Sequence, residues 1–263
     1  MKKTAPMPID IRLMNMASAL LLVVVLSLLL GSGLWWLLRH PMFAIQAIAV
    51  HGEVSRNNAV TLQNHVMPQL KGNFFTINLD ETRDIFQSVP WVRVAVVHRD
   101  FPNRLRTVLQ EHHALALWGE EGTSTLLNEQ GQVFEANIED LDVDKLPRLK
   151  GPDAQSMTVA RMFNVLRPQF AAVDMEIDQL ELTPRGGWRV LTQYGAFIEL
   201  GRGTEKELVA RLNLFFKTLS QVTSRYDRTV TALAGADLRH KDGYALRLRG
   251  VSTLETDINN KKP

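Results

Sequence analysis

The hydrophobic pattern begins with one uncharged, strongly apolar run, from Leu13 to Leu38. A helix of that length, at about 1.5 Å per residue, exceeds the roughly 30 Å hydrocarbon core of a bilayer and can span it with some tilt. A tryptophan pair, Trp35 and Trp36, lies near its far end, and three basic residues precede it: Lys2, Lys3 and Arg12. By the positive-inside rule, residues 1–12 are predicted as a cytoplasmic tail and residues 13–38 as a transmembrane helix.

A cleaved signal peptide is the alternative interpretation of this segment, with cleavage near Gly31-Ser32-Gly33. The apolar run continues through LWWLL after these small residues, which favours an uncleaved anchor. Everything after Arg39 is then expected on the outer side of the inner membrane.

The first stretch after the anchor predicts one strand and one helix. FAIQAIAVH at 43–51 is typical of a strand, and Gly52 of the turn after it. Ser55 is a suitable N-cap for a helix. The apolar side of that helix is formed by residues at roughly helical spacing: Val60, Val66 and Leu70.

A second helix is predicted before a strongly alternating hairpin. Asp80 is a suitable cap and Pro90 a stop, with one apolar face made of Leu79, Ile85, Phe86 and Val89. The hairpin that follows turns at Pro102-Asn103. In its first strand, period-two alternation separates Val92, Val94 and Val96 from Trp91, Arg93 and Ala95. The order is β-α-α-β-β, and we expect Phe86 and Trp91 to pack between the second helix and the sheet.

The rest of the chain is mainly β, with two helices. Residues 126–134 predict a hairpin that turns near Gly131, and Thr204 caps a helix through about Leu219. A helix with a break near Pro168 and four strands complete the prediction: 156–173, then 177–183, 188–193, 196–200 and 244–249.

Composition excludes several classes of protein. Of the 263 residues, 45% are hydrophobic and 22% charged, so packed cores are expected and wholesale disorder is not. The net charge of +2 is too balanced for a nucleic-acid binder with a basic patch. The chain has no cysteine, which excludes disulfides and thiolate metal sites.

No catalytic or metal-binding pattern is found. None of the seven histidines has a partner in H-x-x-x-H or H-E-x-x-H spacing. The acidic run Asp140, Asp142, Asp144 has Lys145 and Gly151 where a calcium loop needs Gly and Glu, so we interpret it as a solvated linker. Neither G-x-S-x-G nor S-x-x-K is present. We therefore predict no enzyme, no cofactor and no metal.

Specific residues nevertheless point to a family. The run F-x-I-x-x-I-x-V-x-G ends at Gly52, and later matches include Pro90-Trp91-Val92, Ala95, Val97, Arg99, Pro102-Asn103, Leu105, Glu111, Ala116-Leu117-Trp118, Leu146-Pro147-Arg148-Leu149 and Gly151-Pro152. In this order, after a single span, they resemble the FtsQ/DivIB family of bacterial cell-division proteins. Ala114 departs from the proline that the family usually carries after the glutamate.

The resemblance implies an α+β fold and a division role. After the anchor it implies a POTRA domain at 43–112, a periplasmic β-rich domain with flanking helices at 113–250, and a polar tail at 251–263. The implied function is a non-enzymatic scaffold of the divisome that links early and late septation proteins at midcell. Such a protein would be a single-pass inner-membrane protein enriched at the division septum. Its POTRA domain and transmembrane segment would bind other division proteins.

Binding sites also follow from the resemblance. In this family the C-terminal strands dock the small division proteins FtsB and FtsL, which implies contacts at Arg239, His240, Asp242 and Gly243, and a second contact at Arg185. The family commonly has an aromatic residue at the position of His240. The last strand adds Tyr244, Ala245, Leu246 and Arg247. From the sequence pattern alone, a terminal strand is often a sheet edge, which either accepts a partner strand or faces water behind Arg247 and Arg249.

Two other functions are weighed against this one. A different membrane-tethered POTRA protein, for envelope transport or assembly, would share the anchor and the first domain. An enzyme of the cell wall would need a catalytic cluster, which the sequence does not offer.

Overall fold

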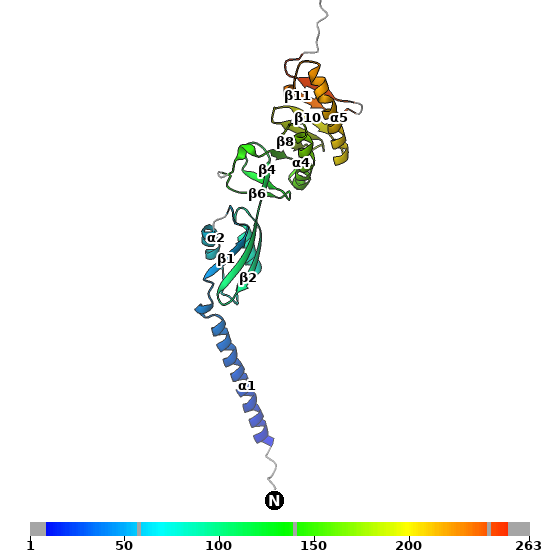
Figure 1. Ribbon diagram of the computed structural model, residues 1–263. Helices are drawn as coiled ribbons and strands as arrows, with labels where there is room; N and C mark the ends of the chain where they lie inside the picture. Colours follow the sequence, from blue (N-terminus) through cyan, green and yellow to red (C-terminus); the bar gives the residue numbers. More distant parts are fainter. Residues whose placement is uncertain (1–8, 57–58, 139–140, 241–242, 252–263) are drawn as a thin grey trace, which may run out of the picture. The chain divides into compact units, whose positions relative to one another are not determined.

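The computed structural model describes residues 9–56, 59–138, 141–240 and 243–251, and the chain divides into two units, Met1–Glu111 and His112–Pro263 (Figure 1). The fold is α+β, as predicted. One N-terminal helix, a small three-stranded unit and a larger β-rich unit with two long helices follow one another along the chain.

The N-terminal helix α1 spans Ile9–Leu38. Its length and composition are sufficient to cross a membrane, and it begins four residues before the apolar run. Trp35 and Trp36 are both largely exposed, which suits side chains at a lipid–water boundary. The guanidinium of Arg39 lies 4.4 Å from the centroid of the Trp35 ring, a cation–π contact at the end of the helix.

The first unit contains the predicted β-α-α-β-β order. Its strands are β1 (Ala47–Gly52), β2 (Val92–Asp100) and β3 (Arg104–Glu111), and its helices are α2 (Ala59–Val66) and α3 (Leu79–Gln87). β3 is central, parallel to β1 and antiparallel to β2. Buried side chains of both helices meet those of the sheet in one core, which includes Leu62, Val66, Phe86, Leu105 and Leu109.

The expected N-cap of α2 is wrong. The hydroxyl of Ser55 donates to Oε2 of Glu111 at 2.8 Å, and the backbone N–H groups of Ser55 and Arg56 donate to the same carboxylate. Glu111 is 2% exposed, so its charge needs these donors. The expected helix face is also rotated: Val60 is 61% exposed, whereas Leu62 and Val66 are buried.

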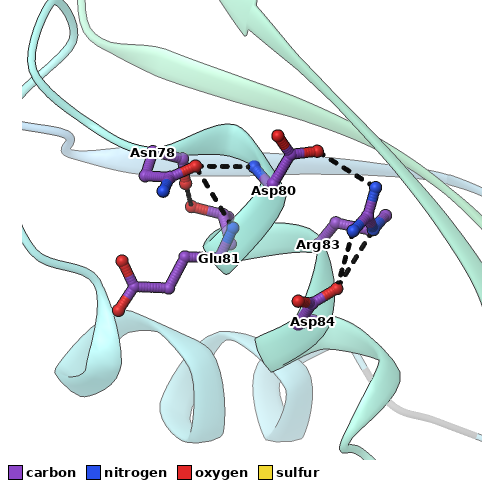
Figure 2. A network of polar contacts seen from close by, with 6 residues as sticks. Asn78, Asp80, Glu81, Arg83 and Asp84 are labelled. Carbon is purple, nitrogen blue, oxygen red and sulfur yellow. Dashed lines mark hydrogen bonds and ion pairs between the residues drawn. The ribbon is translucent and has the colours of Figure 1, made fainter.

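The cap of α3 lies two residues before the predicted one. Oδ1 of Asn78 accepts hydrogen bonds from the backbone N–H groups of Asp80 and Glu81, at 3.0 and 3.3 Å (Figure 2). Asp80 lies in the first turn instead, where a carboxylate is favoured by the helix dipole, and it pairs with Arg83. Either residue type can cap, so the sequence does not distinguish them.

The prediction of which side chains of β2 share a face is wrong, because the strand contains a β-bulge. The register with β3 shifts between Val92 and Val94, and Val92 is buried. After the shift Ala95 and Val97 are buried, whereas Val96 is 45% exposed. Because a bulge inserts one extra residue, every later side chain moves to the opposite face.

Trp91 is buried, but it lies outside the core cluster where we expected it. Its backbone is in the left-handed region, with φ of 70°. The guanidinium of Arg56 lies 5.3 Å from the centroid of its ring. The tryptophan therefore packs beneath the loop that follows β1.

The second unit is built on one large sheet. In its described part nine strands follow the order β12-β11-β10-β9-β8-β7-β4-β5-β6. Their bounds are β4 Ala114–Trp118, β5 Thr125–Asn128, β6 Val133–Glu135, β7 Arg148–Lys150, β8 Ile177–Leu182, β9 Trp188–Thr192, β10 Phe197–Gly201, β11 Leu233–Asp237 and β12 Ala245–Leu248. The predicted strands and the hairpin at Gly131 are confirmed.

Two helices pack against this sheet: α4 (Ser156–Ala171) against β7 and β8, and α5 (Glu205–Ser224) against β10 (Figure 1). Thr204 caps α5, as predicted, in a capping box with Glu207. The helix ends at Ser224 rather than Leu219. The break expected at Pro168 is absent, and α4 continues through this residue. Proline cannot donate to the carbonyl four residues earlier, that of Asn164, but both residues are exposed, so this carbonyl can bond water.

Candidate protein-binding edge

The last strand of the second unit lies at a sheet edge. Among the described residues β12 pairs with one strand, β11, in antiparallel register. The expectation that the terminal strand is an edge strand is therefore confirmed. An edge strand carries backbone groups that can pair with another chain.

The direction of these backbone groups follows from the register. The N–H of Arg249 donates to the carbonyl of Ala232 at 2.8 Å. Backbone groups in an antiparallel pair alternate in direction, and the register shift lies on β11, so the alternation along β12 is unbroken. The backbone N–H and C=O groups of Arg247 and Ala245 thus point toward β11. The groups that point away from it are those of Leu246 and Leu248.

The side chains of β12 alternate between core and solvent. Leu248 is buried and Leu246 packs against the core, whereas Ala245 and Arg247 are exposed. Two leucines thus fix the strand on the core. The carbonyl of Leu248 accepts a hydrogen bond from the N–H of Val251 at 3.4 Å, so the outward groups left for a partner are the N–H and C=O of Leu246 and the N–H of Leu248.

A cavity of about 220 Å³ lies between α5 and the loop that joins β11 to β12. Its lining brings together four predicted site residues, Arg239, His240, Gly243 and Tyr244, with three that sequence reasoning missed: Arg211, Leu214 and Leu238. Tyr244 is held in place: its hydroxyl lies 2.6 Å from Oγ1 of Thr218, and its ring packs edge-on against Phe215. The cavity is therefore built jointly by α5 and the segment before β12. Asp242, another predicted contact, lies outside the described residues.

Arg185 does not line this cavity. It is exposed in the turn between β8 and β9. Trp188, which follows that turn, pairs with Gly201 of β10, and Gly201 (φ 76°) packs so closely against Arg239 that a Cβ would clash. Arg185 and Arg239 therefore lie at the same end of the sheet, in the turn between β8 and β9 and just after β11, respectively.

Comparison with known proteins identifies the family. Residues 43–112 match the family model of a POTRA domain, FtsQ-type, and residues 116–239 that of the cell division protein FtsQ/DivIB, C-terminal. The chain is 37% identical to cell division protein FtsQ of Thiomonas arsenitoxydans, over 97% of this chain and 94% of that protein. It is 33% identical to those of Burkholderia pseudomallei and Bordetella pertussis, which it covers over 99% and 97% of their lengths and which match 96% and 97% of this chain.

This chain belongs to the FtsQ/DivIB family. It is thus a cell-division protein. The C-terminal family match ends at Arg239. The predicted contacts from His240 to Arg247 follow that match in the sequence.

A second cavity in the FtsQ-type β unit is larger but contains none of the predicted contacts. It measures about 710 Å³ and lies between β4, α4 and the start of β8. Its lining mixes apolar and oppositely charged side chains, among them Lys145, Arg167 and Glu176. Within the described residues no three His, Asp or Glu side chains are grouped to hold a metal ion.

An ion pair at the end of β11 holds two charged side chains beside the cavity: Asp237, the last residue of the strand, and Arg239, which follows it. Asp237 accepts two hydrogen bonds from the Arg239 guanidinium, at 2.9 and 2.6 Å, and one from its backbone N–H. The side-chain hydrogen bond from Arg239 is the main cause that lowers the pKa of Asp237 from 3.8 to about 2. Arg211 donates instead to the carbonyls of Leu200 and Arg202. Both arginines are thus held at the cavity in defined positions.

This pair predicts a pH dependence. Because folding lowers the pKa of Asp237, its ionised form stabilises the fold above about pH 4, and that contribution is lost as the pH falls toward about 2. In Arg239→Gln the pKa of Asp237 should return toward 3.8. Carboxyl chemical shifts measured by NMR across this range test both statements. A wild-type midpoint near 3.8 would show that the pair does not form in solution.

Proposed function

We propose that this chain is a non-enzymatic scaffold of the division machinery, which binds FtsB and FtsL through the β12 edge and links early and late septation proteins at midcell. The observation that carries the proposal is the edge itself, with the outward N–H and C=O of Leu246 and the outward N–H of Leu248. β-Augmentation uses such groups: main-chain hydrogen bonds supply affinity, and adjacent pockets select side chains.

The cavity beside β12 supports selective binding. Its volume of about 220 Å³ has room for one large side chain of an added strand. Arg211 and Arg239 on its wall, with exposed Arg247 on the strand, favour an acidic partner. Arg239 is already paired with Asp237, so an incoming carboxylate would share its guanidinium. Such exposed charges chiefly guide association and register, and their effect should weaken as salt rises.

The proposed place of action is the inner membrane, with α1 as a single span, the N-terminus in the cytoplasm and the rest in the periplasm. The basic residues before α1 and the tryptophan pair near its end support this orientation. A fluorescent reporter that folds only in the cytoplasm should remain dark when fused after residue 250. A bright fusion would show that residue 250 lies in the cytoplasm and would contradict this orientation.

Depletion in the source bacterium tests the function itself. If the chain links early and late division proteins, cells that lose it should grow into filaments whose septa do not complete. A plasmid copy should restore division, and a septal fluorescent signal should precede constriction. Normal division in depleted cells would remove the proposed role.

A further inference from the structure

A group of apolar side chains gathers at the end of the first unit that adjoins α1. Phe43 packs edge-on against Phe75 at 4.9 Å between ring centroids, Phe75 against Phe74 at 5.2 Å, and Phe74 against Phe101 at 5.8 Å. These four rings and Met42 are called the aromatic tip. They come from three separate segments of the chain, so the tip is a product of the fold.

Three of the five side chains of the tip are exposed despite their apolar character, whereas Phe74 is buried beneath them. Phe101 is 69% exposed, Met42 59% and Phe75 42%. Single exposed apolar residues are ordinary, but contiguous ones mark a surface that binds something. Met42, Phe75 and Phe101 are not among the side chains of the POTRA core cluster.

The tip is tied to the end of the membrane helix. Phe43 follows Leu38, the last residue of α1, by five residues, a reach of at most about 18 Å. The side-chain amide of Asn73 donates to the carbonyl of Leu38, and the N–H of Phe74 donates to the carbonyl of Phe43 at 2.8 Å. The rings that follow Asn73 therefore cannot lie far from the end of α1.

Hydrogen bonds also hold the tip in shape. Oδ1 of Asn73 accepts from the backbone N–H groups of Phe75 and Thr76, both at 3.1 Å. Arg99 of β2 donates to the carbonyls of Phe74 and Ile77, both at 2.8 Å. A loop fixed in this way presents its rings without a large further loss of conformational entropy on binding.

We propose that the aromatic tip inserts into the interfacial layer of the same bilayer that α1 crosses, and binds phospholipid there. The 30 residues of α1 span about 45 Å, more than the roughly 30 Å hydrocarbon core, so its end at Leu38 lies at or just beyond the lipid headgroups. That layer is only about 5–8 Å thick on each side, and side chains tied to Leu38 reach it. Phenylalanine is among the side chains that interfacial segments bury at the boundary between headgroups and acyl chains.

The positive charge of Arg39, at the end of α1, also favours a phospholipid as the partner of the tip. Arg39 follows α1 directly, and its guanidinium lies over the Trp35 ring. A cation at this depth can pair with lipid phosphates while the rings below it contact acyl chains. The POTRA unit would then have two attachments to the membrane, the covalent one through α1 and the tip.

The absence of cysteine allows a direct test on the full chain. Nitroxide labels are attached to Phe75→Cys and Phe101→Cys, and to the control Val96→Cys, whose exposure of 45% matches that of Phe75. Each chain is placed in nanodiscs of phosphatidylethanolamine and phosphatidylglycerol. Power saturation then compares the accessibility of each label to oxygen, which concentrates in lipid, and to a water-soluble nickel chelate. Circular dichroism confirms that the labelled chains are folded.

We expect oxygen-to-nickel accessibility ratios at positions 75 and 101 that are several-fold higher than at position 96. Ratios at 75 and 101 equal to that at 96 in the nanodiscs would overturn the proposal, and a protein partner would then have to cover the tip. The discs contain no division protein, so this outcome leaves the proposed scaffold role untouched.

Discussion

Leu246→Pro should abolish capture of the periplasmic segment of FtsB by this chain without unfolding it. The backbone of Leu246 points away from β11, so its N–H is available to an incoming strand. Proline removes that donor and places its ring where the partner backbone must approach. It removes no hydrogen bond within the sheet, because edge strands tolerate proline on their outer side.

The matched controls are Leu246→Ala and Ala245→Pro. The alanine variant keeps the donor and loses only part of a half-buried side chain, so it should bind FtsB nearly as well as the wild type. Ala245→Pro removes a backbone group that faces β11, so it should lower the stability of the C-terminal edge as well as binding. The comparison is a pull-down at fixed concentration, with folding checked by circular dichroism. Normal capture by a folded Leu246→Pro variant would contradict the proposal.

Phe86→Ala should cost the POTRA unit about 3–5 kcal/mol of unfolding free energy. Phe86 is fully buried, in a core that joins α2, α3 and the three strands. Removing its ring leaves a cavity that a unit of this size cannot fill by collapse, and the loss is a large part of a small domain's stability.

Val60→Ala is the control for this variant. Val60 also lies on a helix of the same unit but is 61% exposed, so its truncation should change stability by less than about 0.5 kcal/mol. Chemical denaturation of residues 43–263, followed by far-ultraviolet circular dichroism, measures both. If the transition of the first unit is unchanged in Phe86→Ala, the ring does not pack as the structure shows.

Long-period patterns in the sequence predicted most of the architecture. The long N-terminal helix, the β-α-α-β-β order and the terminal edge strand each rest on many residues, so an error at one position does not alter them. Features that depend on a single residue were predicted less well. The bulge after Val92 inverts the faces of β2, and Asn78 rather than Asp80 caps α3. The neighbouring residues in the sequence do not indicate where the bulge or the cap lies, because the packing of the folded unit decides both.

The candidate-site residues that are close together in the sequence could be predicted, whereas those that only the fold brings to the cavity could not. His240, Gly243 and Tyr244 are neighbours in sequence, and the structure places them with Arg239 at one cavity. Arg211 and Leu214 lie on α5, and only the packing of that helix beside β10 brings them to the same wall. A capped amphipathic helix was evident in the sequence, but which of its exposed residues would border the edge was not.

The most direct test of the edge is amide hydrogen exchange along β12, measured by NMR with and without the periplasmic segment of FtsB. The account predicts that the amides of Leu246 and Leu248, which point away from β11, exchange freely in the isolated chain and become protected in the complex. The amide of Arg247, already paired with β11, should change little. Binding that leaves the amides of Leu246 and Leu248 unprotected would contradict strand addition at this edge.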